Sequence, residues 1–348
     1  MKWLLGITLT LVALCVGLGF AELTLRASHL VSVTGLATVS TEEFGRIPGM
    51  FSPTPTFVDR RESLLPHRVS VNALGYRGAA FPRQKPPGEF RILHLGDSFT
   101  FGDFVNDDET LPAQIEAQLR RTCPSVRVIN AGLPGSTITE QREILSRARD
   151  VSPDMVLLSF TENDVTDLST VPMWEQLRVN REQKSGFPLG IVYPILRHTA
   201  LWNLAMKLRG RLHEQARTSR TEETGTIGVV PNPVLRTRYA AVFGAMAGSL
   251  QHDGTPFLFT LFPAHQTLYK RWSTEQLDGA TGMANSAGIP VISTTDALRA
   301  DGRDERQLYL MPIDGHPSAT GYAVAATEIS RALLAQQALA THCAVGHE

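Results

Sequence analysis

Short apolar runs alternate with amphipathic segments along most of the chain after Phe90, and this alternation constrains the fold more than any other feature. The apolar runs predict buried strands, and the segments with apolar residues three and four positions apart predict helices. Strands and helices that alternate through short connections form a parallel sheet with right-handed crossovers and helices on both faces. The sequence therefore predicts a three-layer α/β/α domain. Its strands are expected at 91–95, 126–129, 155–160, 256–262 and 290–293, and its helices at 110–121, 139–149, 236–251, 273–287 and 319–337.

Three candidate loops begin where predicted strands stop. They are Gly96–Ser98 after the first strand, Asn130–Gly135 after the second and Thr161–Asp164 after the third. In open parallel sheets, ligands bind at the edge formed by the carboxyl ends of the strands. We therefore expect the three loops to meet at one edge of the sheet and to form a site there.

Ser98 is the candidate nucleophile, because it follows Gly-Asp in a glycine-flanked turn where the backbone can bend sharply. A serine is a useful nucleophile only when a base removes its proton, a third group orients that base, and donors stabilise the oxyanion. His316, just before the last predicted helix, is the candidate base, and Asp314 lies two residues before it. Each residue alone also fits an ordinary turn or helix start, so the interpretation depends on their combination.

The chain resembles the SGNH (GDSL-type) hydrolase superfamily in four blocks, which occur in the family's order and span about residues 89–337. The blocks are 96–98, 130–135, 161–164 and 314–317. The resemblance implies a flavodoxin-like sheet, no organic cofactor or metal, a nucleophilic Ser98, and a triad completed by His316 and Asp314. It also implies an oxyanion hole made by the backbone N–H groups of Ser98 and Gly135 and by the side-chain amide of Asn163, and it leaves Gly132 as a turn glycine. Residues 72–78 are similar to a segment of envelope-associated members.

Two positions depart from the family's pattern. Thr161 stands where the third block usually begins with glycine, which leaves the Asn163 amide in place. The last block usually separates its aspartate and histidine by three positions, whereas Asp314 and His316 are two apart. The geometry must therefore differ, and either Asp314 or a backbone carbonyl orients His316.

Three further polar residues need an interpretation. Arg77 lies in an ordered-looking segment, 69–78, which predicts a short strand that covers the core and runs into a turn; binding of an anionic group by Arg77 is the alternative. His94 lies inside the first strand and is expected to be structural. His265 follows a buried strand and is interpreted in the same way, with contact to a substrate as the alternative.

The chain begins with an uncharged apolar run, Trp3–Ala21, that nearly spans a hydrocarbon core of about 30 Å at about 1.5 Å rise per residue. We expect an uncleaved, single-pass anchor in the cell membrane. A signal cleaved after Gly19-Phe20-Ala21, which would give a secreted protein, is the alternative, and a buried soluble helix is a third. The first two place the rest of the chain outside the cytoplasm, in the periplasm for an anchored protein.

The predicted organisation is an anchor or signal at 1–26, an irregular, proline-rich extension at 27–88, the hydrolase-like domain at 89–337 and a tail at 338–348. An insertion at 165–234 carries basic residues and a leucine stripe, which predict an amphipathic helix packed on the domain; a lid or a helix on the membrane surface are the alternatives. Cys123 and Cys343 are far apart in sequence and are expected to be unpaired, with one disulfide in an oxidising compartment as the alternative.

The charge balance excludes a general attraction to nucleic acid, since 33 Lys and Arg face 34 Asp and Glu. Our hypothesis is a membrane-anchored, extracytoplasmic serine esterase that acts on a small-molecule or glycan ester. Acetyl groups on envelope polysaccharide or peptidoglycan and lipid esters are both compatible substrates. The competing hypotheses are an O-acyltransferase that acts on an envelope polysaccharide and a non-catalytic glycan-binding module.

Overall fold

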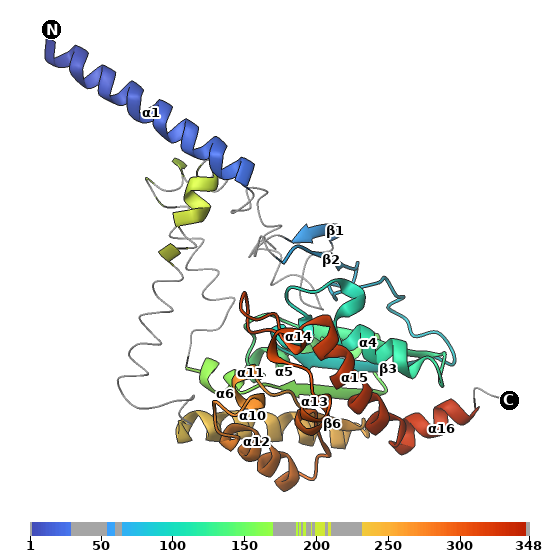
Figure 1. Cartoon of the computed structure of the whole chain (residues 1–348). Helices are drawn as coiled ribbons and strands as arrows, with labels where there is room; N and C mark the ends of the chain where they lie inside the picture. Colours follow the sequence, from blue (N-terminus) through green and yellow to red (C-terminus); the bar gives the residue numbers. More distant parts are fainter. Residues whose placement is uncertain are drawn as a thin grey trace. The chain divides into compact units, whose positions relative to one another are not determined.

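The computed structural model describes residues 2–28, 54–59, 65–169 and 232–345, together with short pieces between 186 and 209 (Figure 1). Two compact units are present, and one of them contains the N-terminal helix α1, Lys2–Ser28, with residues 179–225. Within it, residues 5–28 are long and apolar enough to cross a membrane or to serve as a signal, and an 18-residue stretch of them has a mean hydropathy of 1.9. Near the end of α1, the Glu22 carboxylate accepts the backbone N–H groups of Ala200 and Leu201, at 2.8 and 3.0 Å.

The second unit is built on a five-stranded, entirely parallel sheet, which confirms the predicted fold class. The spatial order of its strands is β4-β3-β5-β6-β7. Because β4 lies on one side of β3 and β5 on the other, the direction of winding reverses between β3 and β5, and such a switch point is where ligands bind in open sheets. The strands span Phe90–Gly96 (β3), Val126–Gly132 (β4), Met155–Phe160 (β5), Phe257–Leu261 (β6) and Val291–Ser293 (β7).

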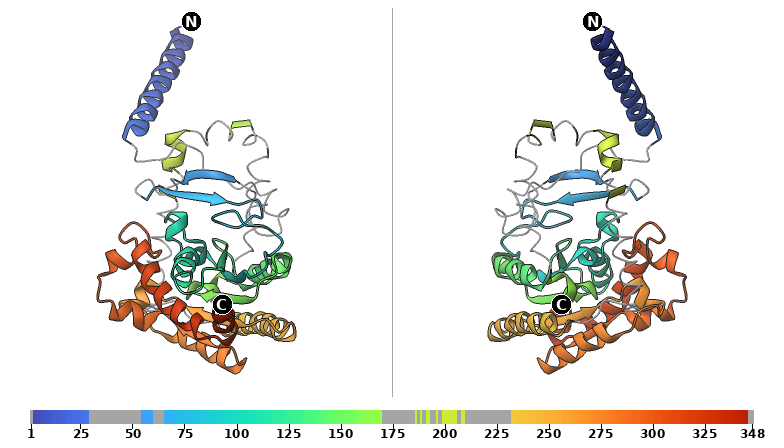
Figure 2. Two further views of the ribbon diagram at one scale, coloured as in Figure 1. Left: turned by 90° about the vertical axis from the view of Figure 1, so that its right-hand side faces the viewer. Right: turned by 90° about the vertical axis from the view of Figure 1, so that its left-hand side faces the viewer.

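Helices cover both faces of this sheet, and alternate residues of each strand contribute to opposite faces. Leu93 and Leu95 pack into one apolar cluster with helices α5, α10 and α12, and Ile92 packs into the other with α4 and α15. Figure 2 shows α10 (gold) running beside α5 (green) in both views. The helices span Leu111–Leu119 (α4), Ile138–Arg147 (α5), Pro233–His252 (α10), Glu275–Ser286 (α12) and Ala319–Leu334 (α15).

The starts of α4 and α5 follow from local sequence. The Thr110 side chain accepts the Ala113 N–H at the start of α4, and a proline stands in its first turn. At the start of α5, Thr137 and Glu140 form a capping box. The Thr137 side chain accepts the backbone N–H of Glu140, and the Glu140 side chain accepts the backbone N–H of Thr137. Both helices therefore begin within a residue or two of the predicted positions.

The C-terminal end of the chain differs from the prediction. The last predicted helix ends at Leu334, and a further helix, α16, runs from Gln337 to Val345 where a tail was expected. In α16, Cys343 forms a disulfide with Cys123, with 5.1 Å between the Cα atoms, so the expectation that these cysteines are unpaired was wrong. The physical reason is packing: α15 lies along α4, which ends just before Cys123, and this brings residues 220 apart in sequence together.

Loss of this disulfide is expected to destabilise the sheet-containing unit. Cys123→Ser should lower its free energy of unfolding by about 2–4 kcal/mol, because the cross-link restricts the unfolded chain. Urea unfolding of the wild type with and without reductant, beside Cys123→Ser, measures the effect, and Cys15→Ser is the control because Cys15 is unpaired. An unchanged midpoint in reductant would contradict the prediction.

The extension before the domain contains a two-stranded sheet of β1, Thr54–Asp59, and β2, His67–Val71. The predicted strand and turn in 69–78 are confirmed, because β2 leads into a turn in which the Asn72 side chain accepts the N–H groups of Leu74 and Tyr76. Tyr76 is buried in the same apolar cluster as α5 and α10. Of the insertion 165–234, the structure describes the end of α6, Asn163–Asp167, the two residues after it, the start of α10, and short pieces between 186 and 209 that include helical residues 200–205. The rest of the predicted amphipathic helix lies outside the described residues.

Candidate active site

The serine of the first block stands at the carboxyl edge of the sheet, beside the switch point. Strand β3 ends at Gly96, and Asp97 caps the short helix α3, Ser98–Phe101, by accepting the backbone N–H of Phe99 at 2.9 Å. Ser98 is therefore the first residue of a helix that starts directly after a central strand. Its hydroxyl oxygen lies 2.7 Å from Nε2 of His316.

The other ring nitrogen of His316 contacts Asp314. His316 Nδ1 lies 2.5 Å from Asp314 Oδ1, and the backbone N–H of His316 donates to the same oxygen at 2.8 Å. A carboxylate that accepts the N–H two residues ahead forms an Asx turn. This turn explains how two residues only two positions apart can pair, and it shows that Asp314, and not a backbone carbonyl, bonds Nδ1.

The surroundings of His316 favour its protonated form. Burial opposes the charge on the imidazole, but the hydrogen bond to Asp314 and the negative charges of Asp314, Asp103 and Asp97 outweigh it and raise the pKa of His316 above its usual value. Two aromatic rings pack on the imidazole, Phe99 with 5.1 Å and Phe104 with 5.4 Å between ring centroids. The site therefore stabilises an imidazolium and holds the ring in one orientation.

The glycine block after β4 packs directly against α3. A Cβ atom on Gly132 would lie 2.1 Å from the backbone nitrogen of Phe101, so only glycine fits. Gly132 is thus required for this close approach as the last residue of β4, which corrects its interpretation as a turn glycine. Leu133 N–H donates to the Gly96 carbonyl at 3.0 Å, and Gly135 follows in the turn with φ +70°.

The third block places the Asn163 amide within a hydrogen-bonded group of side chains. The Thr161 hydroxyl donates to Asn163 Oδ1 at 2.5 Å, so the residue that replaces the usual glycine fixes the orientation of the amide. Asn163 Nδ2 donates to Asp167 Oδ2 at 2.9 Å and, more weakly, to Asp97 Oδ2 at 3.3 Å. The Asn163 amide is therefore shared with two carboxylates, which the sequence analysis did not anticipate.

Beneath this group lies a fully buried carboxyl, Asp164. Burial raises its pKa well above the usual value, and the nearby charges of Asp97, Asp167 and Glu162 add to the shift. Its Oδ2 accepts the Thr161 N–H at 3.1 Å. The burial of Asp164 thus favours its protonated form, and its side chain holds the third block through the Thr161 N–H.

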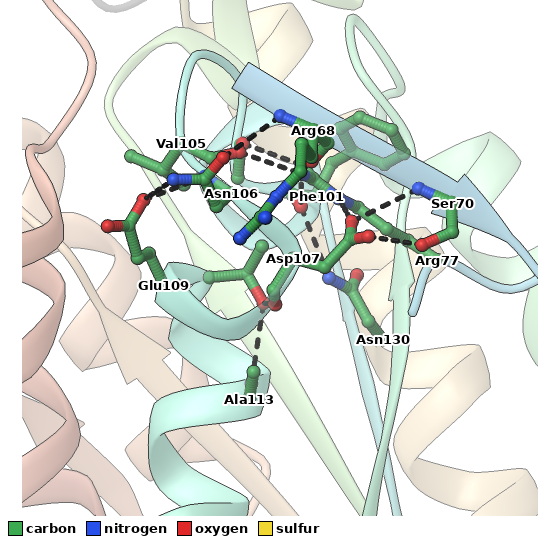
Figure 3. Close-up of polar contacts among 12 residues, drawn as sticks. Arg68, Ser70, Arg77, Phe101, Val105, Asn106, Asp107, Glu109, Ala113 and Asn130 are labelled. Carbon is green, nitrogen blue, oxygen red and sulfur yellow. Dashed lines mark hydrogen bonds and ion pairs between the residues drawn. The ribbon is translucent and has the colours of Figure 1, made fainter. Parts of the chain in front are cut away.

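Arg77 supports the loop that follows α3, as Figure 3 shows. Its Nε donates to Asp107 Oδ1 at 2.9 Å, and its four other N–H groups donate at 2.6–3.2 Å to the backbone carbonyl oxygens of Arg68, Phe101, Gly102 and Val105. A guanidinium has five N–H donors, so each has a protein acceptor. Arg77 thus cross-links the loop next to the site. It has no N–H group left to bind an anion, so the alternative role in anion binding is not supported.

The two remaining histidines differ in their surroundings. His94 is fully buried within the sheet, where Nε2 lies 2.7 Å from the Ser159 hydroxyl oxygen and burial lowers its pKa to about 3. It is a neutral residue of the core, as expected. His265 begins α11, His265–Leu268, directly after β6, and its Nδ1 pairs with Glu305.

A parallel α/β sheet that carries a serine–histidine–aspartate chain at its switch point is an arrangement typical of serine hydrolases. The chain belongs to the GDSL-like lipase/acylhydrolase family, whose model matches residues 94–324, more than half of its length. The protein is accordingly a hydrolase that acts on ester bonds.

Several solved structures are similar to this one at low sequence identity. A putative lipolytic protein of the G-D-S-L family from Desulfitobacterium hafniense DCB-2 is 15% identical, with 70% of this chain and 99% of that chain covered and a TM-score of 0.43. A two-domain esterase active on acetylated mannans is 14% identical, with 70% and 49% covered and a TM-score of 0.42. A catalytic mutant of an acetylxylan esterase from Geobacillus stearothermophilus is 15% identical, with 71% and 95% covered and a TM-score of 0.39. No curated protein sequence matches the chain.

Proposed function

We propose that the protein is a serine esterase in which Ser98 attacks the ester carbonyl carbon. The observation that carries the proposal is the unbroken hydrogen-bonded chain from the Ser98 hydroxyl through His316 to Asp314. His316 Nε2 takes the hydroxyl proton as the bond from Oγ to carbon forms, and Asp314 stabilises the resulting imidazolium. His316 then gives this proton to the leaving alkoxide, and a water molecule, activated by the same base, releases the acid from the acyl-enzyme.

The oxyanion of the tetrahedral intermediate is proposed to bind the backbone N–H groups of Ser98 and Gly135 and the Asn163 amide. Donors directed at a developing negative charge account for a large share of the rate enhancement of such enzymes. The Asn163 amide is shared with Asp167 in the free protein, at 2.9 Å, so an N–H has to be withdrawn from this carboxylate when the oxyanion forms.

Removal of Asp167, the carboxylate that competes with the oxyanion for the Asn163 amide, should therefore increase the rate of ester hydrolysis. Asp167→Ala frees one amide N–H and removes a negative charge from the vicinity of the oxyanion, and kcat is expected to rise about 3- to 10-fold, the equivalent of one hydrogen bond. Steady-state kinetics with 4-nitrophenyl acetate measures it, with Ser169→Ala, just beyond the same helix, as the control. A decrease in kcat would mean that Asp167 instead holds Asn163 in its productive orientation.

The acid limb of the pH profile tests the role of Asp314. As a base, His316 must be neutral, so its raised pKa puts the wild-type acid limb of kcat/KM above the usual histidine value of 6.5. Asp314→Asn removes the charge that raises this pKa, leaves burial to lower it, and should move the limb to lower pH. We also expect the plateau to fall by about 10²- to 10⁴-fold. A limb that stays in place in the variant would assign the wild-type pKa to another group.

We further propose that α1 anchors the protein in the cell membrane, with the esterase unit outside the cytoplasm and acting on an acylated envelope glycan. The uncharged apolar run Trp3–Ala21 within α1 supports the anchor, and the Cys123–Cys343 disulfide supports an oxidising compartment. Fractionation of cells and alkylation of free thiols in intact cells test both points. Cytosolic recovery with reduced cysteines would refute them.

The first experiment is to label the detergent-solubilised full chain with a fluorophosphonate probe, and to compare it with Ser98→Ala. Labelling of the wild type and its loss in the folded variant would support an activated serine. Product analysis on an acetylated glycan then separates hydrolysis, which yields acetate alone, from transfer, which yields a newly acetylated sugar. A folded wild type that binds glycan and resists labelling would make the protein a binding module and refute the esterase.

A further inference from the structure

A second histidine–carboxylate pair lies beside the candidate active site. We propose that His265 binds the alcohol portion of the ester through Nε2, and that this alcohol is a sugar with free hydroxyl groups. The inference rests on the proposed esterase function and its glycan substrate, and it adds the residue that recognises the sugar.

The position of His265 ties it to both sides of the site. A Cβ atom on Gly315, the residue between Asp314 and His316, would lie 3.2 Å from both Cδ2 and Nε2 of His265. On the other side, the backbone N–H of Ala264 donates at 2.8 Å to Glu162, the residue before Asn163. His265 therefore stands at the carboxyl edge of the sheet between the loop of the base and the loop of the amide.

The ring of His265 is held from one side only. Its Nδ1 pairs with Glu305 Oε1, and Arg271 binds both, with Nη2 at 2.9 Å from Nδ1 and Nη1 at 3.0 Å from Glu305 Oε2. The Tyr309 ring packs beside it at 5.8 Å between centroids. The side chain is 11% exposed, and Nε2 has no hydrogen-bond partner among the described parts of the chain. An imidazole fixed at one nitrogen and open at the other is arranged to bind a ligand.

The chemistry of the pair indicates what it binds. The Arg271 guanidinium and His265 keep the Glu305 carboxylate ionised and lower its pKa to about 2. Glu305 and Arg271 together occupy Nδ1, so Nε2 is the ring nitrogen left to hydrogen-bond a ligand. A hydroxyl group both donates and accepts, so it can hydrogen-bond Nε2 in either tautomer, and Arg271, whose side chain is 48% exposed, adds polar donors at the rim. A sugar supplies such hydroxyl groups, whereas a lipid alcohol needs apolar walls.

Two acetyl esters with different alcohols test the proposal. Both 6-O-acetylglucose and 4-nitrophenyl acetate give the same acetyl-enzyme, so a difference between them arises from the alcohol alone. His265→Ala in the full chain should lower kcat/KM for the sugar ester about 10-fold, mainly through KM, because one hydrogen bond is lost. The value for 4-nitrophenyl acetate should stay within about 2-fold. His265→Gln, whose amide can both donate and accept a hydrogen bond, should recover part of the loss, and His252→Ala, at the exposed end of α10, should change neither substrate.

The outcomes separate this inference from the proposed function. An equal loss on both esters would show that His265 only supports His316, and no loss on either would show that it has no role; both overturn the proposal. If His265→Ala fails to fold, His265→Phe, which keeps a buried ring without a polar atom, provides the same comparison. Binding of 6-O-acetylglucose to Ser98→Ala, followed by calorimetry, needs no catalysis: a loss of binding in the His265→Ala background upholds the sugar contact even if the wild type hydrolyses neither ester, and retained binding refutes it.

Discussion

Replacement of His316 by alanine is expected to lower kcat for ester hydrolysis by about 10⁴- to 10⁶-fold with little change in KM, since the base of a triad acts mainly on the transition state. Without the imidazole, the Ser98 hydroxyl has no acceptor at 2.7 Å for its proton, and the leaving alkoxide has no donor. The residual rate should reflect the oxyanion donors and substrate binding alone.

Steady-state kinetics on 4-nitrophenyl acetate and the rate of fluorophosphonate labelling both measure the effect of His316→Ala. The double variant Ser98→Ala/His316→Ala should be no slower than either single variant, because the two residues act as one unit. Circular dichroism checks the fold. A His316→Ala protein that keeps a tenth of the wild-type kcat would exclude His316 as the base.

Replacement of Arg77 by alanine is expected to cost about 3–5 kcal/mol in the free energy of unfolding of the sheet-containing unit, because a buried ion pair loses one partner. Asp107 would keep a charge without its guanidinium, and four backbone carbonyl groups would lose their donor (Figure 3). Arg77→Lys should be intermediate, since an ammonium keeps the charge but cannot make the five bonds of the planar group.

Arg77→Ala should also reduce activity, because Arg77 holds the loop that carries Phe104. Phe104 adopts the left-handed conformation, with φ +67°, and its ring packs on His316. A bulky residue in this conformation persists only where its surroundings enforce it. Release of the loop should let Phe104 relax and displace the imidazole, and a misplacement near 1 Å lowers kcat by about 10²-fold.

Urea unfolding measures the loss of stability in Arg77→Ala. Steady-state kinetics without urea, at a temperature well below the unfolding transition, measures the loss of activity. Arg68→Ala is the matched control, because Arg68 is exposed and contributes only its backbone to the same cluster. Wild-type stability and activity in Arg77→Ala would show that the hydrogen-bonded cluster is dispensable.

The sequence alone predicts the sheet and the order of the site blocks, because both depend on patterns of residues that are close together in the chain. A buried strand such as 155–160 is a continuous apolar run, and Ser98 and His316 each lie at the end or start of an element. The short helices α3, α6 and α11 contain four or five residues, too few to display a helical period. They were missed for this reason, although they carry Ser98, Asn163 and His265.

The features that could not be predicted depend on tertiary contacts. The disulfide needs α15 to pack along α4. The role of Arg77 depends on four backbone carbonyl groups, which every residue type possesses and which therefore leave no trace in the sequence. The sharing of the Asn163 amide with Asp167 was visible only as a spacing of four, which is common on helices.

The pairing of Asp314 with His316 inside a single turn has a consequence for how the site can change shape. The carboxylate accepts both the ring N–H and the backbone N–H of His316, so the proposed base and the group that orients it move together with residues 314–316. In a triad whose members come from three separate loops, two distances vary independently as the protein fluctuates. Here the carboxylate and the imidazole belong to one turn, so a movement of residues 314–316 as a unit changes the separation of Ser98 and His316 and leaves the contact between Asp314 and His316 in place.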